Sequence, residues 1–413
     1  MSTNTLMDIV GQLSFERASA LPSEARAADM IYAWLLQLGL TPERQQFPVT
    51  TYTDARAQLV LTSPVCRRVN TTAVGLAGRS TGSEREAEIV YVAQGDLCDI
   101  SRLKPGDIAL YDYDYWRMPS VYRRLAECGA NGLICINKPG RQLPNVSFLP
   151  PGFRAPGPVA ACWISVEDAL GMVKQPTRGL MRVDQNVIDS FSQNITCMVR
   201  GTVLADEMVI VAAHYDTVPE SPGAEDNASG CALLLKLAQS LANRPARRSV
   251  MLAFLGCEEL GLKGSAHLVA QLSEHAKVVA GVNVDCVGAA IGMAEARCAA
   301  DEAVLSLARD AARAVGVSVS VGQGIMGSDD AHFTARRIPA VSIARYGKAA
   351  VRHTPQDGVH WLSTEALEQD YEYVHALVYR LADEAAIKEH ASVPEALYED
   401  AAHYVRHGSL PER

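Results

Sequence analysis

The chain has 413 residues, of which 48% are hydrophobic and 21% charged. This length predicts two or three domains, and the composition is that of an ordinary soluble globular protein. The net charge of −9 argues against a general binder of nucleic acids or anionic membranes, because such proteins normally carry a basic face. The basic pairs Arg247-Arg248 and Arg336-Arg337 are interpreted as solvated surface.

The N-terminus has no basic segment followed by an apolar one, and no apolar stretch reaches the ~18 residues that span a bilayer. We therefore expect a cytoplasmic protein with no membrane partner. The ten cysteines are scattered without CxxC pairing. Cys231, Cys257 and Cys286 lie in or beside helical or strand-like runs, where a free cysteine usually acts as a small apolar side chain.

The first 186 residues contain two kinds of pattern. Residues 1–57 open with helical periodicity, and Gly39 marks the end of that helix. Residues 58–186 contain short apolar strands separated by Gly and Pro, at 59–61, 89–92, 107–111 and 159–164. This punctuation predicts a compact β-rich domain inserted into the chain.

After residue 195, apolar strands alternate with amphipathic helices. The strands are expected at 208–213, 249–255, 278–284 and 340–343, and the helices at 231–241, 302–315 and 365–383. Strands that are apolar throughout predict a mixed, mostly parallel sheet flanked by helices on both faces. We expect one α/β domain from residues 1–57 and 187–385, an insert at 58–186, and a C-terminal helix or tail at 386–413.

Each of the four expected strands ends near His, Asp or Glu residues. These are His214 after 208–213, Glu258-Glu259 after 249–255, Asp285 after 278–284, and His353 after 340–343. Because ligands of open α/β sheets bind outside the carboxyl ends of the strands, we expect these side chains along one edge. Together with Asp216 and Asp226, they supply the imidazoles and carboxylates that a pair of divalent metals needs.

Taken singly, each of these segments has an ordinary structural alternative. His214-Tyr215-Asp216 is also typical of a surface turn, Asp226-Asn227 of a helix cap, and Glu258-Glu259 of a surface helix start. Two adjacent carboxylates after an apolar strand are costly to bury without cations, which favours a metal site. His214 and Asp216 point to the same side of an extended segment, so Asp216 is suited to fix the tautomer of a metal-bound His214.

The charges of the candidate ligands also match two divalent cations. Asp226, Glu259 and Asp285 supply three negative charges and a bridging hydroxide supplies a fourth, with Asp226 giving one oxygen to each metal. One glutamate of the Glu258-Glu259 pair then stays free as a general base. The mixed nitrogen and oxygen ligands favour two Zn²⁺, with Co²⁺ or Mn²⁺ as alternatives.

In this order and spacing, the motifs resemble those of the M28 family of zinc aminopeptidases over residues 195–383. The matching segments are His214-Tyr215-Asp216, Asp226 to Gly230, Cys257 to Gly261, Asn283 to Gly288, Ser328-Asp329 with Phe333, and His353-Thr354 with Asp357. Residues 58–186 resemble the protease-associated (PA) insert that many such enzymes carry. The resemblance implies a zinc-exopeptidase fold of the phosphorylase/hydrolase-like type with a PA-like insert.

The resemblance also implies a role for each site residue. His214 and Asp285 would bind one metal, Glu259 and His353 the other, and Asp226 would bridge them. Glu258 would be the general base, and Asp216 would orient His214. The implied activity is hydrolysis of the N-terminal residue from a peptide substrate with a free N-terminus.

Other functions remain open at this stage. A metallo-carboxypeptidase or another amide hydrolase of the same fold would need a basic pocket, for which Arg345 and Arg352 are candidates. A non-catalytic, receptor-like binding protein would have lost metal ligands, and this chain has not. The sequence leaves the side-chain preference, the role of the insert and the oligomeric state open, so an oligomer is compatible with it.

The chain departs from the family pattern near residue 328. It reads Ser328-Asp329-Asp330 where relatives have Ser-Asp-His or Ser-Asp-Tyr, and Ile325 stands where some relatives have a tyrosine that steadies the oxyanion. The oxyanion-stabilising donor is therefore unassigned. Five further histidines are expected on helix or loop surfaces without partners: His267, His275, His332, His360 and His375.

Overall fold

The computed structural model describes residues 5–80, 86–273, 275–384 and 391–411. The chain divides into two compact units. The larger unit comprises Met1–Val49 and Phe191–Val405, and the smaller unit comprises Thr50–Ser190 and Arg406–Arg413. Two long strands, β1 (Pro42–Ser63) and β8 (Thr177–Val199), have residues in both units.

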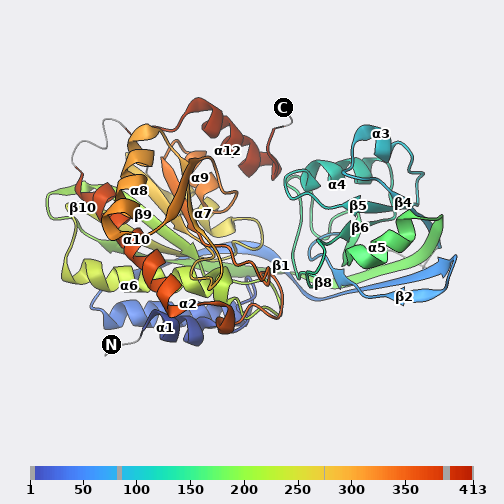
Figure 1. Ribbon diagram of the computed structural model, residues 1–413, viewed down its shortest axis with the longest axis horizontal. Helices are drawn as coiled ribbons and strands as arrows, with labels where there is room; N and C mark the ends of the chain where they lie inside the picture. Colours follow the sequence, from blue (N-terminus) through green and yellow to red (C-terminus); the bar gives the residue numbers. More distant parts are fainter. Residues whose placement is uncertain (1–4, 81–85, 274, 385–390, 412–413) are drawn as a thin grey trace. The chain divides into compact units, whose positions relative to one another are not determined.

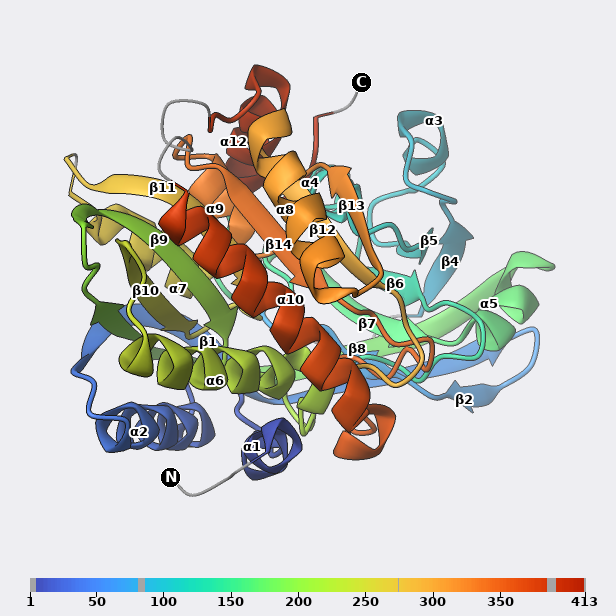
Figure 2. The same cartoon turned by 60° about the vertical axis from the view of Figure 1, so that its left-hand side comes forward.

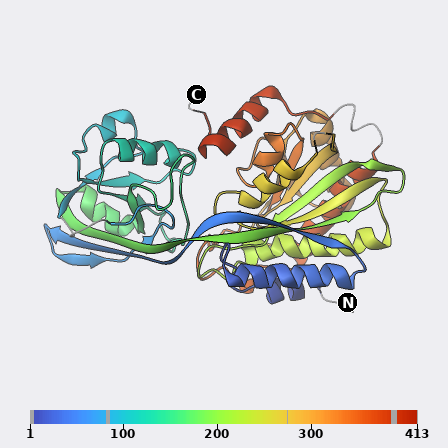
Figure 3. The same ribbon diagram turned by 180° about the vertical axis from the view of Figure 1, so that it is seen from behind.

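The larger unit is built on one mixed sheet, seen from opposite sides in Figures 1 and 3. Its strand order is β13-β12-β14-β11-β9-β10-β8. The four central strands, β14, β11, β9 and β10, are parallel to one another, whereas β12 and β8 run antiparallel to their neighbours β14 and β10. The strands are β9 (Leu204–His214), β10 (Arg248–Leu255), β11 (Lys277–Val284), β12 (Ala294–Ala299), β13 (Val319–Gln323) and β14 (Ala340–Ala344).

Helices cover both faces of this sheet, and Figure 2 shows α6, α8 and α10 on one of them. In β9, Val209, Val211 and Ala213 face the apolar cluster under α1, α2, α6, α8 and α10, whereas Ile210 and Ala212 face α7 and α9. Because successive strand side chains alternate between faces, burial on both sides explains the unbroken apolar run. The predicted mixed, mostly parallel sheet flanked by helices is confirmed.

The helices and turns of the larger unit have these bounds: α1 (Leu6–Leu13), α2 (Pro22–Gln37), η1 (Ala224–Ala228), α6 (Ser229–Asn243), α7 (Lys263–Gln271), α8 (Glu302–Val315), α9 (Asp330–Thr334), η2 (Val359–Trp361) and α10 (Thr364–Asp383). The last helix, α12 (Glu395–His407), follows the residues of α10 and lies within the predicted C-terminal segment. No helix in the described ranges is long and apolar enough to cross a membrane. All ten cysteines are free thiols, as expected.

The strands of the smaller unit continue the sheet from β8, and the unit has two apolar clusters. Its strand order is β8-β4-β5-β6-β7-β3, with β4 to β7 parallel, and β1 pairs with β2. Its elements are β2 (Arg67–Val69), β3 (Thr72–Ala73), β4 (Ala87–Tyr91), α3 (Leu97–Ile100), β5 (Ile108–Asp112), α4 (Met118–Glu127), β6 (Gly132–Ile136), β7 (Ala160–Ile164) and α5 (Val166–Val173). The predicted domain bounds and the PA-like identity of this segment remain predictions.

Arg248 corrects the interpretation of the basic pairs as solvated surface. Its side chain is buried, and Nε donates to Glu207 Oε2 at 2.9 Å. The guanidinium also donates to the main-chain carbonyls of Leu381 and Glu384, at the C-terminal end of α10. A cation is favourable at a helix C-terminus because carbonyl groups there lack partners within the helix.

Arg17 joins the N-terminal segment to the loop that follows β9. Its guanidinium is fully buried. Within the described part of the chain, every hydrogen bond that it donates goes to a main-chain carbonyl. These carbonyls belong to Leu13, Phe15, Tyr215, Pro222 and Gly223. The loop that Arg17 holds leads from His214 to Asp226, so its position affects both residues.

Replacing Arg17 by Met should destabilise the fold strongly, because five buried carbonyls lose a charged donor. A hydrogen bond to a charged group contributes roughly 1.5–3 kcal/mol, so we expect the free energy of unfolding to fall by at least about 3 kcal/mol. Urea unfolding followed by circular dichroism measures this change. The matched control is Arg26→Met, since Arg26 is exposed and stacks on Phe15, a contact that contributes roughly 0.5–1 kcal/mol. Equal losses in the two variants would contradict this account of Arg17.

Candidate metal centre

The central strands deliver polar side chains to one edge of the larger unit's sheet. His214 is the last residue of β9, and Asp285 follows directly after β11. The amide N–H of Asp285 still donates to Ile343 O of β14 at 3.0 Å, which fixes the start of the loop. Glu258-Glu259 and His353 lie in the segments after β10 and β14. These are carboxyl ends of parallel strands, as the sequence pattern predicts.

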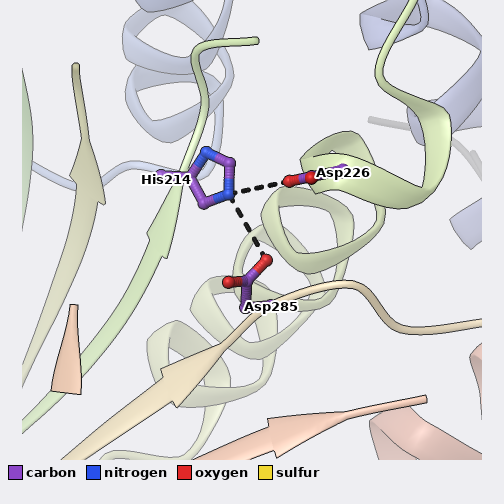
Figure 4. A group of neighbouring side chains, drawn as sticks. All are labelled: His214, Asp226 and Asp285. Carbon is purple, nitrogen blue, oxygen red and sulfur yellow. Dashed lines mark hydrogen bonds and ion pairs between the residues drawn. The ribbon is translucent and has the colours of Figure 1, made fainter. Parts of the chain in front are cut away.

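Two groups of candidate ligands meet at this edge. In the first, Nε2 of His214 lies 3.0 Å from Asp226 Oδ1 and 3.3 Å from Asp285 Oδ1 (Figure 4). In the second, Nε2 of His353 lies 3.1 Å from Asp226 Oδ2 and 3.3 Å from Glu259 Oε2. Asp226 belongs to both groups and turns a different oxygen toward each histidine. The structure thus brings together all five residues that the sequence identifies as candidate ligands.

The backbone around Asp226 explains why its carboxylate is available. Asn227, rather than Asp226, serves the start of α6, because Asn227 Oδ1 accepts from Gly230 N at 2.9 Å. The same oxygen accepts from Cys286 N at 3.2 Å, which ties this turn to the loop after β11. Asp357 accepts from the amide N–H of Asp226 at 3.1 Å. The helix-cap alternative therefore holds for Asn227 and not for Asp226.

Asp216 holds the turn that carries the two adjacent glutamates. Its Oδ1 accepts from Glu258 N at 3.0 Å, and its Oδ2 accepts from Glu259 N at 3.2 Å and from Ser19 Oγ at 2.6 Å. Oδ1 also lies 3.5 Å from Nδ1 of His214, and the role of Asp216 in orienting that ring remains a prediction. Asp216 is buried, so the surface-turn alternative is wrong.

Glu24, in the first turn of α2, was not predicted and reinforces the same turn. Its Oε1 accepts from Cys257 N at 3.0 Å and from Ser192 Oγ at 2.9 Å, and its Oε2 accepts from Ala20 N at 2.9 Å. Burial, with the charge of Asp216, raises the pKa of Glu24 to about 8. Acidic residues are common in the first turn of any helix, so the sequence carries no signal of this role. Three consecutive amides, Cys257 to Glu259, are held by two buried carboxyl groups.

The ligand groups form an acidic site that is buried at His214, Asp226 and Asp285 and partly exposed at Glu259 and His353. Burial raises the pKa of Glu258 well above its usual value, and the charges of Glu259 and Asp285 add to this effect while His214 opposes it. Burial also raises the pKa of Glu259. Burial alone would raise the pKa of Asp226. Hydrogen bonds from His214 and His353 outweigh burial and hold this pKa well below its usual value. Burying several carboxylates together is costly, and bound cations would offset that cost.

The segment near Ser328, which departs from the family pattern, contributes residues both to the candidate site and to the fold around it. Ser328 Oγ lies 2.9 Å from Asp285 Oδ2 and 3.3 Å from Glu258 Oε1, so it links a candidate ligand to the candidate base. Asp330 accepts from the amides of Met326 and Ser328 at the start of α9, which is a structural role. Ile325 packs against the apolar cluster on the α7 and α9 face of the sheet and offers no hydrogen-bond donor from its side chain.

The expectation that five histidines lack partners is wrong for at least three of them. Aromatic rings contact His267 (Phe47, 5.0 Å), His360 (Trp361, 4.9 Å) and His375 (Tyr371 and Tyr379, 5.7 and 4.6 Å). His332 is half-buried, and burial lowers its pKa to about 4. None of these four belongs to the ligand groups found among the described residues.

The two arginines considered for a basic pocket have different surroundings. Arg345 is buried in an ion pair with Asp370, with Nη2 2.8 Å from Oδ1 and Nε 2.9 Å from Oδ2. Because this guanidinium is held at two points by a buried carboxylate, it stabilises the fold and is not available to bind a substrate. Arg352 lies at the site instead, with Nε 3.8 Å from Asp226 Oδ2 and a side chain that is 42% exposed.

Part of the chain matches a peptidase family, and two relatives with similar sequences are named aminopeptidases. Residues 194–378 match peptidase family M28. Aminopeptidase YwaD of Bacillus subtilis is 30% identical over 302 residues, which are 70% of this chain and 62% of the relative. An aminopeptidase of Pseudomonas aeruginosa is 27% identical over 313 residues, 68% of this chain and 56% of the relative. The match thus spans less than two thirds of these relatives' own lengths.

Solved structures of two aminopeptidases share the fold over most of the chain. The aminopeptidase from Aneurinibacillus sp. strain AM-1 has a TM-score of 0.76 at 25% identity, covering 92% of this chain and 93% of that one. A zinc aminopeptidase from Bacillus subtilis has a TM-score of 0.74 at 25% identity, covering 92% and 95%. The family match, the shared fold and these relatives together show that residues 194–378 of this chain belong to peptidase family M28.

Proposed function

We propose that this protein is an aminopeptidase that hydrolyses the N-terminal residue of peptides and depends on two Zn²⁺. His214 and Asp285 would hold one ion, Glu259 and His353 the other, and Asp226 would bridge them. The relatives with related sequence or fold are named aminopeptidases, and one of the solved structures is named a zinc aminopeptidase. The observation that carries the proposal is the spacing of the ligand atoms.

The spacing matches what zinc requires. Ligand atoms about 2.0–2.1 Å from an ion, at tetrahedral angles, are about 3.3 Å from one another. The four imidazole-to-carboxylate distances run from 3.0 to 3.3 Å. Nitrogen and carboxylate oxygen donors are also those that zinc accepts, and the buried carboxylates supply the negative charge that two divalent cations need. The residues present therefore fit the proposed ions.

The protein's own groups supply the proton transfers. Bound zinc ions would polarise the scissile carbonyl and lower the pKa of a water molecule. Glu258 accepts the proton of the attacking water and then delivers it to the leaving amine. Its raised pKa suits a group that must both take and release a proton. Ser328 orients the Glu258 carboxyl group, and Asp216 and Glu24 fix the backbone that carries it.

A carboxypeptidase or another amide hydrolase of the same fold is the second candidate. It would need a free cation to bind the substrate's carboxylate. Arg345 is committed to Asp370, so only Arg352 of the two arginines is suited to that task. A non-catalytic binding protein is disfavoured because all five candidate ligands are present at suitable distances.

Blocked substrates separate these candidates. We expect the protein to cleave aminoacyl p-nitroanilides and C-terminally amidated dipeptides, and to leave N-acetylated dipeptides intact. The reason is that an aminopeptidase recognises a free α-amino group. Rates measured with and without a chelator give the result directly. Cleavage of N-acetylated but not of amidated dipeptides would favour the carboxypeptidase instead, and cleavage that is indifferent to the chelator would contradict the metal requirement.

Replacing Glu258 by Gln should remove the general base and keep the side-chain volume. We expect kcat to fall by roughly 10²–10⁴-fold, the usual contribution of a positioned acid–base group. Zinc content, measured by elemental analysis after dialysis, should stay at two per chain. Glu302→Gln, at the exposed start of α8, serves as the control and should keep the parent rate. Full activity of Glu258→Gln with both ions bound would remove Glu258 from this role.

Replacing His353 by Ala should affect zinc binding itself. The second ion loses its only imidazole donor among the proposed ligands, so we expect one zinc per chain after dialysis against a weak chelator. His375→Ala is the control, because His375 packs between Tyr371 and Tyr379 in α10. This control should retain two zinc ions. Retention of two tightly bound ions by His353→Ala would exclude His353 as a ligand.

A further inference from the structure

Arg352 places a permanent positive charge beside the proposed metal ligands. Its Nε lies 3.8 Å from Asp226 Oδ2, the same oxygen that lies 3.1 Å from His353 Nε2. The side chain of Asp226 is 5% exposed, whereas that of Arg352 is 42% exposed. The guanidinium therefore lies at the solvent-facing edge of the ligand cluster, where a substrate would arrive.

Contacts around Arg352 hold the guanidinium in place. Its central carbon lies 4.9 Å from the centre of the Tyr346 ring, and Nη1 lies 3.8 Å from Sγ of Cys286. The loop that carries both Tyr346 and Arg352 is fixed by the amide N–H of Gly347, which donates to Glu225 Oε1 at 2.8 Å. At 3.8 Å the contact with Asp226 is too long for a hydrogen bond, so it orients the guanidinium without consuming one of its five N–H donors.

The proposed reaction develops negative charge that a donor of this kind can stabilise. Water attack on the scissile carbonyl moves a proton to Glu258, so negative charge leaves Glu258 and develops on the former carbonyl oxygen. Ser328 links Glu258 to Asp285, whereas Arg352 lies beside the oxygen of Asp226 that faces His353. The proton acceptor and the cation therefore contact different parts of the ligand cluster. Ile325 has no donor to offer at the position where some relatives have a tyrosine.

We propose that Arg352 is a catalytic residue that donates a hydrogen bond to the scissile carbonyl oxygen and stabilises the charge that develops there. As the water oxygen bonds to the carbonyl carbon, the π-electron pair of the carbonyl moves onto its oxygen, beside Arg352. When the C–N bond breaks, that pair re-forms the carbonyl, and the proton held by Glu258 goes to the leaving amine. This inference rests on the proposed aminopeptidase function and names a further residue for it.

The same guanidinium is also suited to bind the carboxylate of a short peptide. Two kinds of substrate show whether Arg352 contacts that carboxylate or the scissile carbonyl oxygen. An aminoacyl p-nitroanilide has a scissile carbonyl but no carboxylate, whereas a dipeptide has both. The variants are Arg352→Ala and Arg352→Lys. Arg297→Ala is the matched control, since Arg297 is also 42% exposed and pairs with a carboxylate, Glu295, on β12.

We expect kcat/KM of Arg352→Ala to fall by roughly 10²–10³-fold on both substrates, as when one oxyanion donor is lost, with most of the loss in kcat. Arg352→Lys should keep an intermediate rate, and added guanidinium ion should restore part of the activity of Arg352→Ala. Zinc content should stay at two per chain. The Kd of an α-aminophosphonate, a mimic of the tetrahedral state measured by calorimetry, should rise by the same factor as kcat/KM falls. Arg297→Ala should match the parent protein throughout.

Three results would overturn the proposal. Parent-like rates in Arg352→Ala with both ions bound would show that no donor is lost. A loss confined to the dipeptide would assign Arg352 to the substrate's carboxylate, and a loss of zinc would assign it to the metal site. If the parent protein cleaves no substrate with a free N-terminus, the proposed function fails. The calorimetric comparison then decides separately whether Arg352 binds a tetrahedral anionic group.

Discussion

The carboxylate of Asp226 is the feature on which the site depends. Each of its oxygens lies within about 3.1 Å of a different imidazole, His214 on one side and His353 on the other. A bridging carboxylate can serve two ions only if both imidazoles and the remaining carboxylates are held at matching distances. The sheet meets this requirement by ending parallel strands at the same edge, so His214 and Asp285 come from neighbouring strands.

Buried main-chain bonds keep this arrangement rigid. Asn227 ties the turn before α6 to the loop after β11, Asp357 accepts from the amide of Asp226, and Asp216 accepts from the amides of both glutamates. Polar groups buried in this way stabilise a fold only when their hydrogen bonds are satisfied. The carboxylates that bind backbone therefore fix the positions of the carboxylates that belong to the two candidate ligand groups. Separate carboxylates for holding the backbone and for binding a metal suit a site whose ligands must be held within a few tenths of an ångström.

Much of the larger unit follows from its apolar pattern. Strands such as β9 and β11 are buried on both faces, so they appear in the sequence as largely apolar runs that end at candidate ligands. β12 and β13 were not predicted, because β12 alternates Ala with Glu and Arg and β13 is only half-buried at the sheet edge. A strand also begins at Pro42, where the sequence pattern suggested only the end of a helical region.

The parts of the site that escaped prediction depend on distant contacts. Glu24 lies 233 residues from Cys257, and nothing in the first turn of α2 distinguishes it from an ordinary helix start. Arg248 resembled a surface charge because its partners, the carbonyls at the end of α10, are remote in sequence. Motif order identified candidate ligands because each follows its own strand. Hydrogen bonds between segments far apart leave no such local pattern.

Anomalous diffraction at the zinc edge, from crystals grown with zinc, tests the bridging role of Asp226 most directly. The account predicts two peaks per chain, one contacting His214 and Asp285 and the other contacting His353 and Glu259. Each peak should contact a different oxygen of Asp226. A single peak at saturating zinc, or two peaks with Asp226 bound to only one of them, would contradict the dinuclear site.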